Sequence, residues 1–450
     1  MGQHQLLPRD FLWGVAASAY QVEGAAGEDG RGRSIWDDFA HTPGKVAHGQ
    51  TGDVACDHYH RYLEDVALMA DLGVNAYRFS VAWPRVEPEG DGRENPQGMD
   101  FYSRLVDALL ERGILPVPTL YHWDLPASLE ARGGWRSRDT VQRFAAYAER
   151  MASQLGDRAK VWITHNEPWC QAFLGHAVGV HAPGMKDPAA AVRVAHHLLL
   201  SHGLAHDAMK ANRPDLAVGI ALNPAPFDSP GGDPDDLAAL RLADGLHNRW
   251  FLDALVDGRY PEDVAGHLVR SLGVGPFDPW DLRRIGGRLD FLGINYYNPV
   301  HVARPGPGDS GYRTLPQRPP LTDMGWEVEP DGLRRLLARI ARDYPGVPLY
   351  VTENGVAYPD RAGEDGRVHD ADRIRYLAEH VGALRQAMAE GAPVRGYFYW
   401  SLLDNFEWQL GYTMRFGLVA MGPGLERRPK DSFEAYRGLI AAARAGAPVA

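Results

Sequence analysis

Two short apolar segments, each ending beside a glutamate, constrain this chain more than any other feature. Residues 161–169 read VWITHNEPW, and residues 348–355 read PLYVTENG. The β-branched and aromatic runs 161–164 and 349–352 predict short buried strands. Pro168 then blocks further regular strand pairing after the first of them. Each predicted strand therefore delivers a carboxyl group to its end, Glu167 in one case and Glu353 in the other.

A lone strand-terminal glutamate is usually a residue that caps a loop, but two of them need a fold that brings both strand ends to one rim. A (β/α)8 barrel does this, because its strands are parallel and its functional residues lie at their C-terminal ends. A carboxyl at the mouth of an apolar strand is poorly solvated, so we expect a raised pKa for Glu167, which suits a general acid. Two carboxyls across a scissile bond are the apparatus of glycoside hydrolysis.

The rest of the chain repeats the alternation of strands and helices that such a barrel requires. Further strands are predicted over 11–16, 75–81, 115–121, 217–222, 289–294 and 394–399. Helices are predicted over 62–71, 100–112, 138–155, 189–212, 236–256, 332–344, 370–390 and 430–444. This pattern predicts the α/β class, a (β/α)8 TIM barrel with long loops at the C-terminal face of the strands. No linker interrupts it, so we expect a single domain over 1–450, with the Pro/Gly-rich stretch 304–320 as a surface loop over the barrel mouth.

Composition excludes several classes of function. The formal net charge of -11 argues against nucleic acid as a partner. Two cysteines form no disulfide framework, and there is neither a signal-peptide pattern nor an apolar run of the ~20 residues that span a membrane. We therefore expect a cytoplasmic protein with no membrane partner, and leave a homo-oligomer open. Four histidines at helical spacing could resemble a metal site, but no carboxylate or cysteine cluster accompanies them, so we expect no metal; they are His196, His197, His202 and His206.

Several longer motifs occur in a fixed order, each near the end of a predicted strand or helix. They read FLWGVAASAYQVEGA, YRFSVAWPRV, LYHWDLP, THNEPW, GINYY, YVTENG, YWSLLDNFEW and RRPKDSF. By these motifs the chain resembles glycoside hydrolase family 1, the β-glucosidase family, over nearly its whole length. The resemblance implies a retaining β-glycosidase, without a cofactor, that hydrolyses terminal non-reducing β-D-glucosyl residues of small β-glycosides and oligosaccharides, as in cellulose degradation. It extends this expectation to β-galactosyl and β-fucosyl residues.

The resemblance also implies roles for individual residues. Glu353 is the expected nucleophile and Glu167 the expected acid/base. Catalytic support is expected from Arg78, Asn166, Asn295 and Tyr297. Substrate binding is expected from Gln21, His122, Trp123, Asn166, Trp400, Glu407 and Trp408, with Trp400 beneath the sugar ring. The leaving-group side is expected to include Cys170, His181, Asn223 and Trp326, and a cis peptide bond is expected between Trp400 and Ser401.

Three other functions compete with this interpretation. A 6-phospho-β-glycosidase needs cationic and hydroxyl groups near the 6-phosphate, whereas Glu407 stands where phosphate-specific members carry Ser. A transglycosidase on the same scaffold differs in the access of water rather than in its catalytic residues. A sugar-binding pseudoenzyme would lack one catalytic glutamate, and this chain has both.

Overall fold

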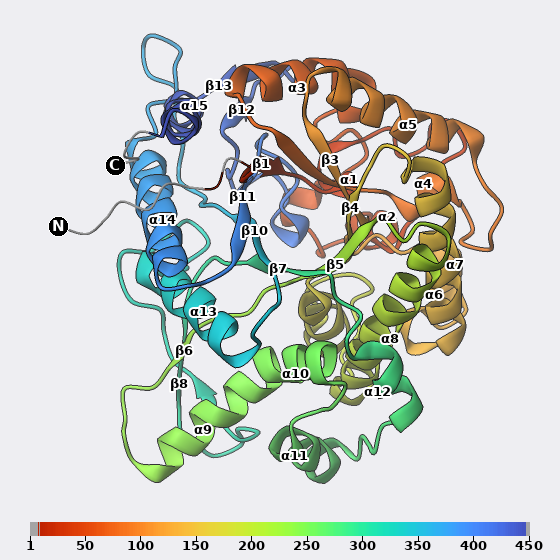
Figure 1. The fold of residues 1–450 in the computed structure, drawn as a ribbon, viewed down its shortest axis with the longest axis vertical. Helices are drawn as coiled ribbons and strands as arrows, with labels where there is room; N and C mark the ends of the chain where they lie inside the picture. Colours follow the sequence, from red (N-terminus) through yellow and green to blue (C-terminus); the bar gives the residue numbers. More distant parts are fainter. Residues whose placement is uncertain (1–7, 9, 447–450) are drawn as a thin grey trace.

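The computed structural model describes residues 8 and 10–446 and contains a closed barrel of eight parallel strands surrounded by helices (Figure 1). The order around the barrel is β1-β11-β10-β7-β5-β4-β3-β2. Strand β1 pairs with β11 on one side and with β2 on the other, which closes the sheet. Their bounds are β1 Leu12–Ala16, β2 Ala76–Ser80, β3 Leu115–Tyr121, β4 Val161–Asn166, β5 Ala217–Leu222, β7 Phe291–Asn295, β10 Leu349–Asn354 and β11 Val394–Trp400. All eight predicted strands are present, and the TIM-barrel prediction is confirmed.

Helices cover the outside of the barrel and connect successive strands (Figure 1). The larger ones are α3 His58–Leu72, α5 Pro96–Glu111, α7 Arg138–Leu155, α8 Pro188–Asn212, α13 Pro330–Asp343, α14 Ala371–Ala389 and α15 Asp431–Arg444. Four short helices lie in the loops: α1 Ala19–Val22, α2 Ile35–Ala40, α4 Trp83–Val86 and α6 Ala127–Ala131. Each long helix overlaps the range predicted for it.

The segment between β5 and β7 differs from the prediction. One helix is predicted over 236–256, but the structure has three consecutive helical elements there. They are α9 Pro234–Asp244, the π-helical segment η4 Gly245–Arg249 and α10 Trp250–Asp257. Two more helices, α11 Glu262–Leu272 and α12 Pro279–Ile285, lie where none was predicted. Both are short, and each begins at a proline-containing turn, so the apolar repeat that marks a helix extends over too few turns to stand out.

The barrel strands separate two apolar layers, and this determines which side chains reach the site. Trp162 on β4 belongs to the layer between strands and helices, whereas its neighbour Ile163 belongs to the cluster inside the barrel. Successive side chains of a strand point to opposite faces, so alternate residues of β4 line the interior. The interior cluster also includes Trp400, at the C-terminal end of β11. Side chains that follow these strand ends therefore meet at one opening.

Smaller elements occupy the loops. The strands β6 Phe227–Asp228, β8 Val300–Ala303 and β9 Arg313–Thr314 form one small sheet, and β12 Val419–Met421 pairs with β13 Arg427–Pro429. Residues 304–320 are largely exposed, as expected of a surface loop, but none of them lines the cavity described below. Across residues 8 and 10–446, no helix combines the length and the apolar character needed to cross a membrane.

Candidate active site

A cavity of ≈ 280 Å³ opens at the C-terminal ends of the barrel strands, and both Glu167 and Glu353 line it. Fourteen of the residues predicted from the sequence face this cavity. They are His122, Trp123, Asn166, Glu167, Cys170, His181, Asn223, Asn295, Tyr297, Trp326, Glu353, Trp400, Glu407 and Trp408. The two predicted residues that do not line it, Gln21 and Arg78, lie buried behind its wall. Loops far apart in the sequence thus converge on one site.

The strands that carry the two glutamates lose their regular pairing just where the carboxyls emerge. The register of β4 against β5 shifts between Ile163 and Asn166, and that of β10 against β7 shifts between Val351 and Glu353. Such bulges re-aim side chains next to active sites. The backbone of Glu167 itself has φ 44°, in the left-handed region that non-glycine residues rarely adopt. Local strain of this kind is typical of functional sites.

Glu353 is held by a cation and a phenol. Arg78 on β2 donates from Nη1 to Oε1 of Glu353 over 2.5 Å, and the Tyr297 hydroxyl donates to Oε2 over 2.6 Å. Arg78 is 1% exposed, so its charge is hardly screened by water. Burial and the Glu353 charge together raise the pKa of Tyr297 well above its usual value, so this phenol stays protonated and donates. Both carboxyl oxygens of Glu353 therefore accept a hydrogen bond, one from a cation and one from a phenol.

Glu167 has the opposite surroundings. Burial, and then the negative charge of Glu353, raise the pKa of Glu167 to about 7. Asn295 Nδ2 donates to its Oε1 over 2.8 Å, and the Cys170 thiol donates to its Oε2 over 3.1 Å. Burial raises the pKa of Cys170 as well, so this side chain is a neutral thiol and a donor. Near neutral pH, Glu167 can both give up and take up a proton.

Asn166 joins the two glutamates into one hydrogen-bonded network. Its Oδ1 accepts from Arg78 Nη2 over 2.5 Å and from Asn295 Nδ2 over 2.9 Å. Asn295 Oδ1 in turn accepts from Thr352 over 2.7 Å, which fixes the orientation of its amide. A displacement of any member would therefore move both Glu167 and Glu353.

His122 lines the cavity and keeps one ring donor that has no partner among the described protein atoms. Burial and the charge of Arg78 lower the pKa of His122 well below its usual value, so the ring is neutral. Its Nε2 lies 2.9 Å from the Asn166 side-chain nitrogen and must accept that hydrogen bond. The proton is consequently on Nδ1, which has no partner among the described protein atoms. A buried donor without a partner in a cavity is suited to a ligand oxygen.

Trp400 and Trp408 form the wall beside His122, each with its ring centroid 5.8 Å from the imidazole, and Glu407 lines the cavity next to them. Burial, and then the charges of Glu353 and Glu167, raise the pKa of Glu407 to about 8. The peptide bond between Trp400 and Ser401 is cis, as expected. Gln21 supports this wall from behind, since its Nε2 donates to Phe406 O over 2.8 Å and to Asn405 Oδ1 over 3.0 Å. Direct binding of sugar by Gln21 stays a prediction.

The four residues predicted for the leaving-group side, Cys170, His181, Asn223 and Trp326, all line the cavity. Asn223 Nδ2 lies 3.5 Å from Cys170 Sγ. Burial lowers the pKa of His181 to about 4, so its ring is neutral. Trp326 packs on Tyr297, with ring centroids 5.2 Å apart. These contacts make a largely uncharged opening.

Sequence reasoning missed several residues that line this opening: Trp169, Leu174, His247, Asn298, Met324, Gln409 and Phe416. Trp169 follows the NEP motif directly and packs on His247, with ring centroids 4.6 Å apart. Proximity to the motif could have indicated Trp169 and Gln409. His247 lies in the π-helical segment η4, and nothing in the local sequence marks that irregularity.

The helical histidines of α8 bind protein groups. His196 contacts Tyr260 and Asp281, His197 contacts the carbonyl of Trp135, and His202 contacts Thr164 and the carbonyl of Arg288; His206 lies near Asp207 and Asp290. Within residues 8 and 10–446, no group of three or more His, Cys, Asp and Glu side chains is arranged to hold a metal ion.

Known proteins are similar to this chain both in sequence and in fold. The family model of Glycosyl hydrolase family 1 matches residues 3–445. Beta-glucosidase A of Acetivibrio thermocellus is 45% identical over 438 residues, which cover 96% of this chain and 98% of that protein. A bifunctional beta-D-glucosidase/beta-D-fucosidase of Bifidobacterium breve is 47% identical, covering 97% and 98% of the two chains. The solved family 1 β-glucosidase of Thermotoga maritima superposes with a TM-score of 0.95 at 44% identity, covering 98% and 99%. The chain belongs to glycosyl hydrolase family 1.

Proposed function

We propose that this enzyme is a retaining β-glucosidase that uses Glu353 as nucleophile and Glu167 as acid/base. The observation that carries the proposal is the opposed pair of environments within one cavity. Glu353 binds a guanidinium and a phenol, whereas burial and the Glu353 charge raise the pKa of Glu167 to about 7. A pair of carboxyls whose surroundings divide them in this way identifies an acid and a nucleophile.

The first step transfers the sugar to the enzyme. A carboxylate oxygen of Glu353 attacks C1 of the bound glucoside, and the bond from C1 to the leaving-group oxygen breaks. Glu167 gives its proton to that oxygen, so the alcohol departs neutral and a glycosyl ester of Glu353 remains. Tyr297 and Arg78 keep the attacking carboxylate in place through the hydrogen bonds described above. Asn166 is the residue suited to contact the 2-hydroxyl, where hydrogen bonds strengthen in the transition state.

The second step releases the sugar to water. Esterification removes the negative charge of Glu353, which is one of the causes of the raised pKa of Glu167. The pKa of Glu167 therefore falls, and the carboxylate that formed in the first step acts as a base. It takes a proton from water as the water oxygen attacks C1, and the bond from C1 to Glu353 breaks. Two inversions at C1 give net retention of the β-configuration.

Sugar recognition is assigned to the inner wall of the cavity. Trp400 provides an apolar floor, and His122 Nδ1 and Glu407 offer a donor and an acceptor to the hydroxyls. We assign the 4- and 6-hydroxyls to Glu407, supported from behind by Gln21. A flexible acceptor serves both equatorial and axial 4-hydroxyls, so β-galactosides and β-fucosides are included. The Bifidobacterium breve relative, a β-D-glucosidase and β-D-fucosidase, supports this range.

Proton NMR of p-nitrophenyl β-glucoside hydrolysis tests the proposal. We expect β-glucose as the first product, with the α-anomer appearing only through mutarotation. Glu353→Gly should abolish turnover, and azide should restore it with an α-glucosyl azide product. Glu167→Ala should affect substrates with poor leaving groups far more than activated aryl glucosides, because the latter need little protonation. An α-glucose first product from the wild-type enzyme would contradict the double displacement.

We also propose one domain over the whole chain and a cytoplasmic location. Closure of the barrel by pairing of β1 with β11 supports a single folding unit. Two buried, unpaired cysteines, Cys56 and Cys170, are compatible with a reducing compartment. Limited proteolysis and cell fractionation test these two statements.

A further inference from the structure

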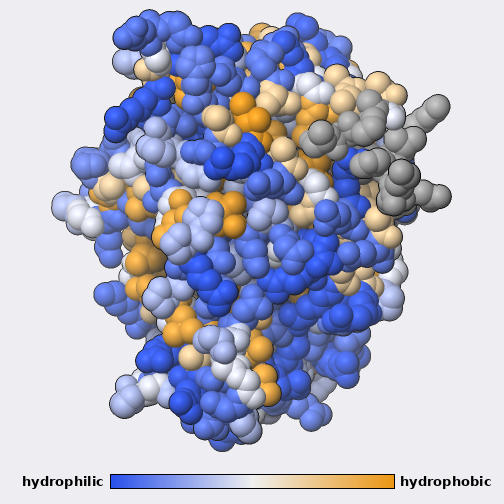
Figure 2. Space-filling model, turned by 90° about the vertical axis from the view of Figure 1, so that its left-hand side faces the viewer, coloured by the Kyte–Doolittle hydropathy of each residue, from blue (hydrophilic) through white to orange (hydrophobic). Residues whose placement is uncertain are grey.

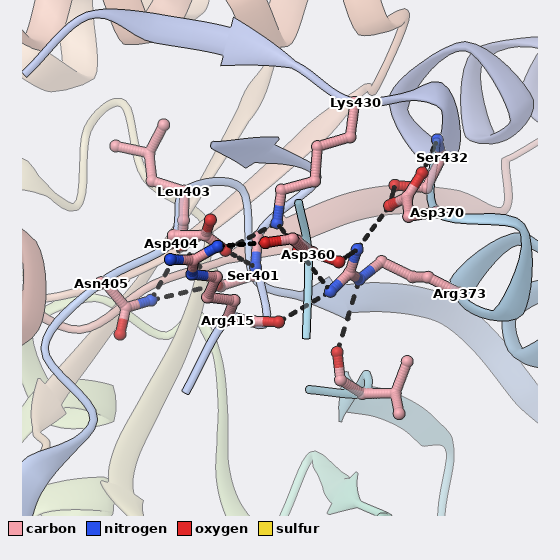
Figure 3. A network of polar contacts seen from close by, with 12 residues as sticks. Asp360, Asp370, Arg373, Ser401, Leu403, Asp404, Asn405, Arg415, Lys430 and Ser432 are labelled. Atoms are coloured by element: carbon pink, nitrogen blue, oxygen red, sulfur yellow. Dashed lines mark hydrogen bonds and ion pairs between the residues drawn. The ribbon is translucent and has the colours of Figure 1, made fainter. Parts of the chain in front are cut away.

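The motif RRPKDSF, near the end of the chain, lies outside the cavity yet contains a fully buried cation. Lys430 is 1% exposed, and its Nζ contacts the carboxylates of Asp360 and Asp404, the latter over 2.8 Å. Figure 3 shows this ammonium pointing between the two carboxylates. A buried lysine is seldom retained unless paired, so this one indicates a specific structural task.

Lys430 is part of a network of buried charges (Figure 3). Arg373 on α14 contacts Asp360 over 2.9 Å, contacts Asp370, and donates to the backbone carbonyl of Arg415 over 2.7 Å. The buried cations Lys430 and Arg373 thus pair with the carboxylates of Asp360, Asp370 and Asp404. Arg415 is exposed, and its guanidinium donates to the backbone carbonyl of Asp360. The network joins the loops after β10 and β11 to the first residues of α14 and α15. The network therefore couples the positions of the outer helices α14 and α15 to those of the loops at the barrel mouth.

The network closes the base of the loop that follows β11. Asp404 Oδ1 accepts from Lys430 Nζ and also from the backbone N–H of Gly417 over 2.8 Å, so one oxygen fastens both ends of segment 404–417. Gly417 has no room for a side chain, because a Cβ there would overlap the backbone of Asp404. Within the closed segment are Glu407 and Trp408, and the Glu407 N–H donates to Gly411 O over 2.6 Å.

We infer that Lys430 and Asp404 are positioning residues that hold Glu407 against the 6-hydroxyl of the sugar and thereby set specificity at that position. This inference rests on the proposed assignment of Glu407 to the 4- and 6-hydroxyls. Without the ammonium, Asp404 and Asp360 face each other as buried like charges, and the base of the loop loosens. Glu407 then loses its alignment with the 6-hydroxyl, although Glu167 and Glu353, on other strands, keep theirs.

A matched pair of substrates isolates this effect. β-D-Galactoside and β-D-fucoside differ only in the 6-hydroxyl, so the ratio of their kcat/KM values cancels every contact to the other hydroxyls and any general loss of active enzyme. We expect Lys430→Met to lower the galactoside-to-fucoside ratio by about tenfold, the loss of one hydrogen bond to a carboxyl group. Asp404→Asn should give a smaller shift, because the amide oxygen still accepts from Gly417 and Lys430.

Two further variants make the test decisive. Ser432 belongs to the same network but binds only Asp370, through its N–H over 2.8 Å and its hydroxyl over 2.6 Å. Ser432→Ala should lower the melting temperature and leave the ratio unchanged. Glu407→Ala should shift the ratio at least as far as Lys430→Met. Suppose that Glu407→Ala shifts the ratio, but the ratio stays within twofold of wild type in both Lys430→Met and Asp404→Asn. This result overturns the inference about Lys430 and Asp404 and leaves the proposed contact of Glu407 intact. An unchanged ratio in Glu407→Ala overturns the proposed contact of Glu407 and, with it, the inference.

Discussion

Glu167 and Glu353 are the same kind of side chain, and in the proposed mechanism it is their neighbours that give them different roles. The sequence placed both carboxyls at strand ends, and burial at a strand mouth correctly predicted a raised pKa for Glu167. It could not predict the thiol of Cys170 at 3.1 Å from Glu167, because that contact depends on the π-helical turn η3 Cys170–Val178. Hydrogen bonds of this kind are set by backbone geometry that a residue pattern does not encode.

The pKa of Glu167 predicts the alkaline limit of the enzyme. In the proposed mechanism Glu167 must be protonated to begin catalysis. Its pKa is about 7, so kcat/KM should fall above pH 7, approaching tenfold per pH unit. The Cys170 thiol favours the carboxylate form, so Cys170→Val should move this limit to higher pH. Initial rates on p-nitrophenyl β-glucoside between pH 5 and 9 measure both. A Cys170→Val profile displaced to lower pH would contradict the role of the thiol as donor.

The glycine of the TENG motif, Gly355, is required by close contact between the ends of β10 and β11. A Cβ on Gly355 would overlap the carbonyl oxygen of Trp400, at the floor of the cavity. Gly355→Ala should therefore displace Trp400 and lower kcat/KM about a hundredfold or more, with a lower melting temperature. Gly382 in α14 is the matched control, since a Cβ there would meet nothing within 4 Å. Gly382→Ala should keep full activity and stabilise by up to about 1 kcal/mol through helix propensity. Equal activity in both variants would refute the steric argument.

Among the secondary-structure elements, those whose sequence follows one simple pattern of apolar residues could be predicted. Barrel strands are buried on both faces and read as short apolar runs, so all eight could be located. The segment between β5 and β7 shows no single apolar repeat along its length. Its helices are short, and η4 interrupts the 3.6-residue repeat and turns His247 toward the cavity. Residues such as Met324 and Phe416 come from long loops, where periodicity carries no information.

Helix α8 carries buried histidines that should make the protein sensitive to acid. Burial lowers the pKa of His202 to about 3, while its Nδ1 accepts from Thr164 and its Nε2 donates to the Arg288 carbonyl. An unfolded histidine takes up a proton near pH 6.5. The unfolded state therefore binds more protons as pH falls from about 6.5 toward 3, and the free energy of unfolding decreases over that window.

The variant His202→Gln tests this linkage. The variant should have a lower melting temperature than wild type at pH 7, because the hydrogen bonds of His202 are disturbed. Between pH 6.5 and 4, however, its melting temperature should fall by less than that of wild type. The expected contribution of His202 is at most about 1.4 kcal/mol per pH unit. His369 is the control, since it is exposed and its pKa is raised by Asp431 and Asp365. His369→Gln should not flatten the pH dependence. An unaltered slope in His202→Gln would show that this ring does not control acid unfolding.

At the scale of the whole molecule, charge disfavours anionic substrates. The formal net charge is -11, and the face of the molecule seen in Figure 2 is mainly hydrophilic, with apolar residues in small scattered groups. The cavity adds three carboxyls, those of Glu167, Glu353 and Glu407, and Arg78 is already paired with Glu353. Both the long-range field and the local charges therefore oppose a phosphorylated sugar. This is the physical basis for preferring the β-glucosidase over a 6-phospho-β-glycosidase.

The strength of that discrimination should depend on pH. Sequence reasoning treated Glu407 as a carboxylate, but burial and its charged neighbours raise the pKa of Glu407 to about 8, so much of it is protonated at neutral pH. A 6-phosphate has its second pKa near 6 and is a dianion above pH 7. Repulsion between the two should therefore grow as pH rises through 8. We expect p-nitrophenyl β-glucoside to exceed its 6-phosphate in kcat/KM by about a thousandfold at pH 9, and by less at pH 6.5.

The comparison is made as a ratio of the two substrates at each pH, because deprotonation of Glu167 slows both equally and cancels. Glu407→Gln supplies the control, since a neutral amide keeps the acceptor oxygen but cannot ionise. Its ratio should be smaller than that of wild type at pH 9 and should vary little above pH 7, where the phosphate charge no longer changes. A wild-type ratio near one at every pH would mean that Glu407 does not face the 6-position, and the assignment of unphosphorylated glucosides as substrates would then be wrong.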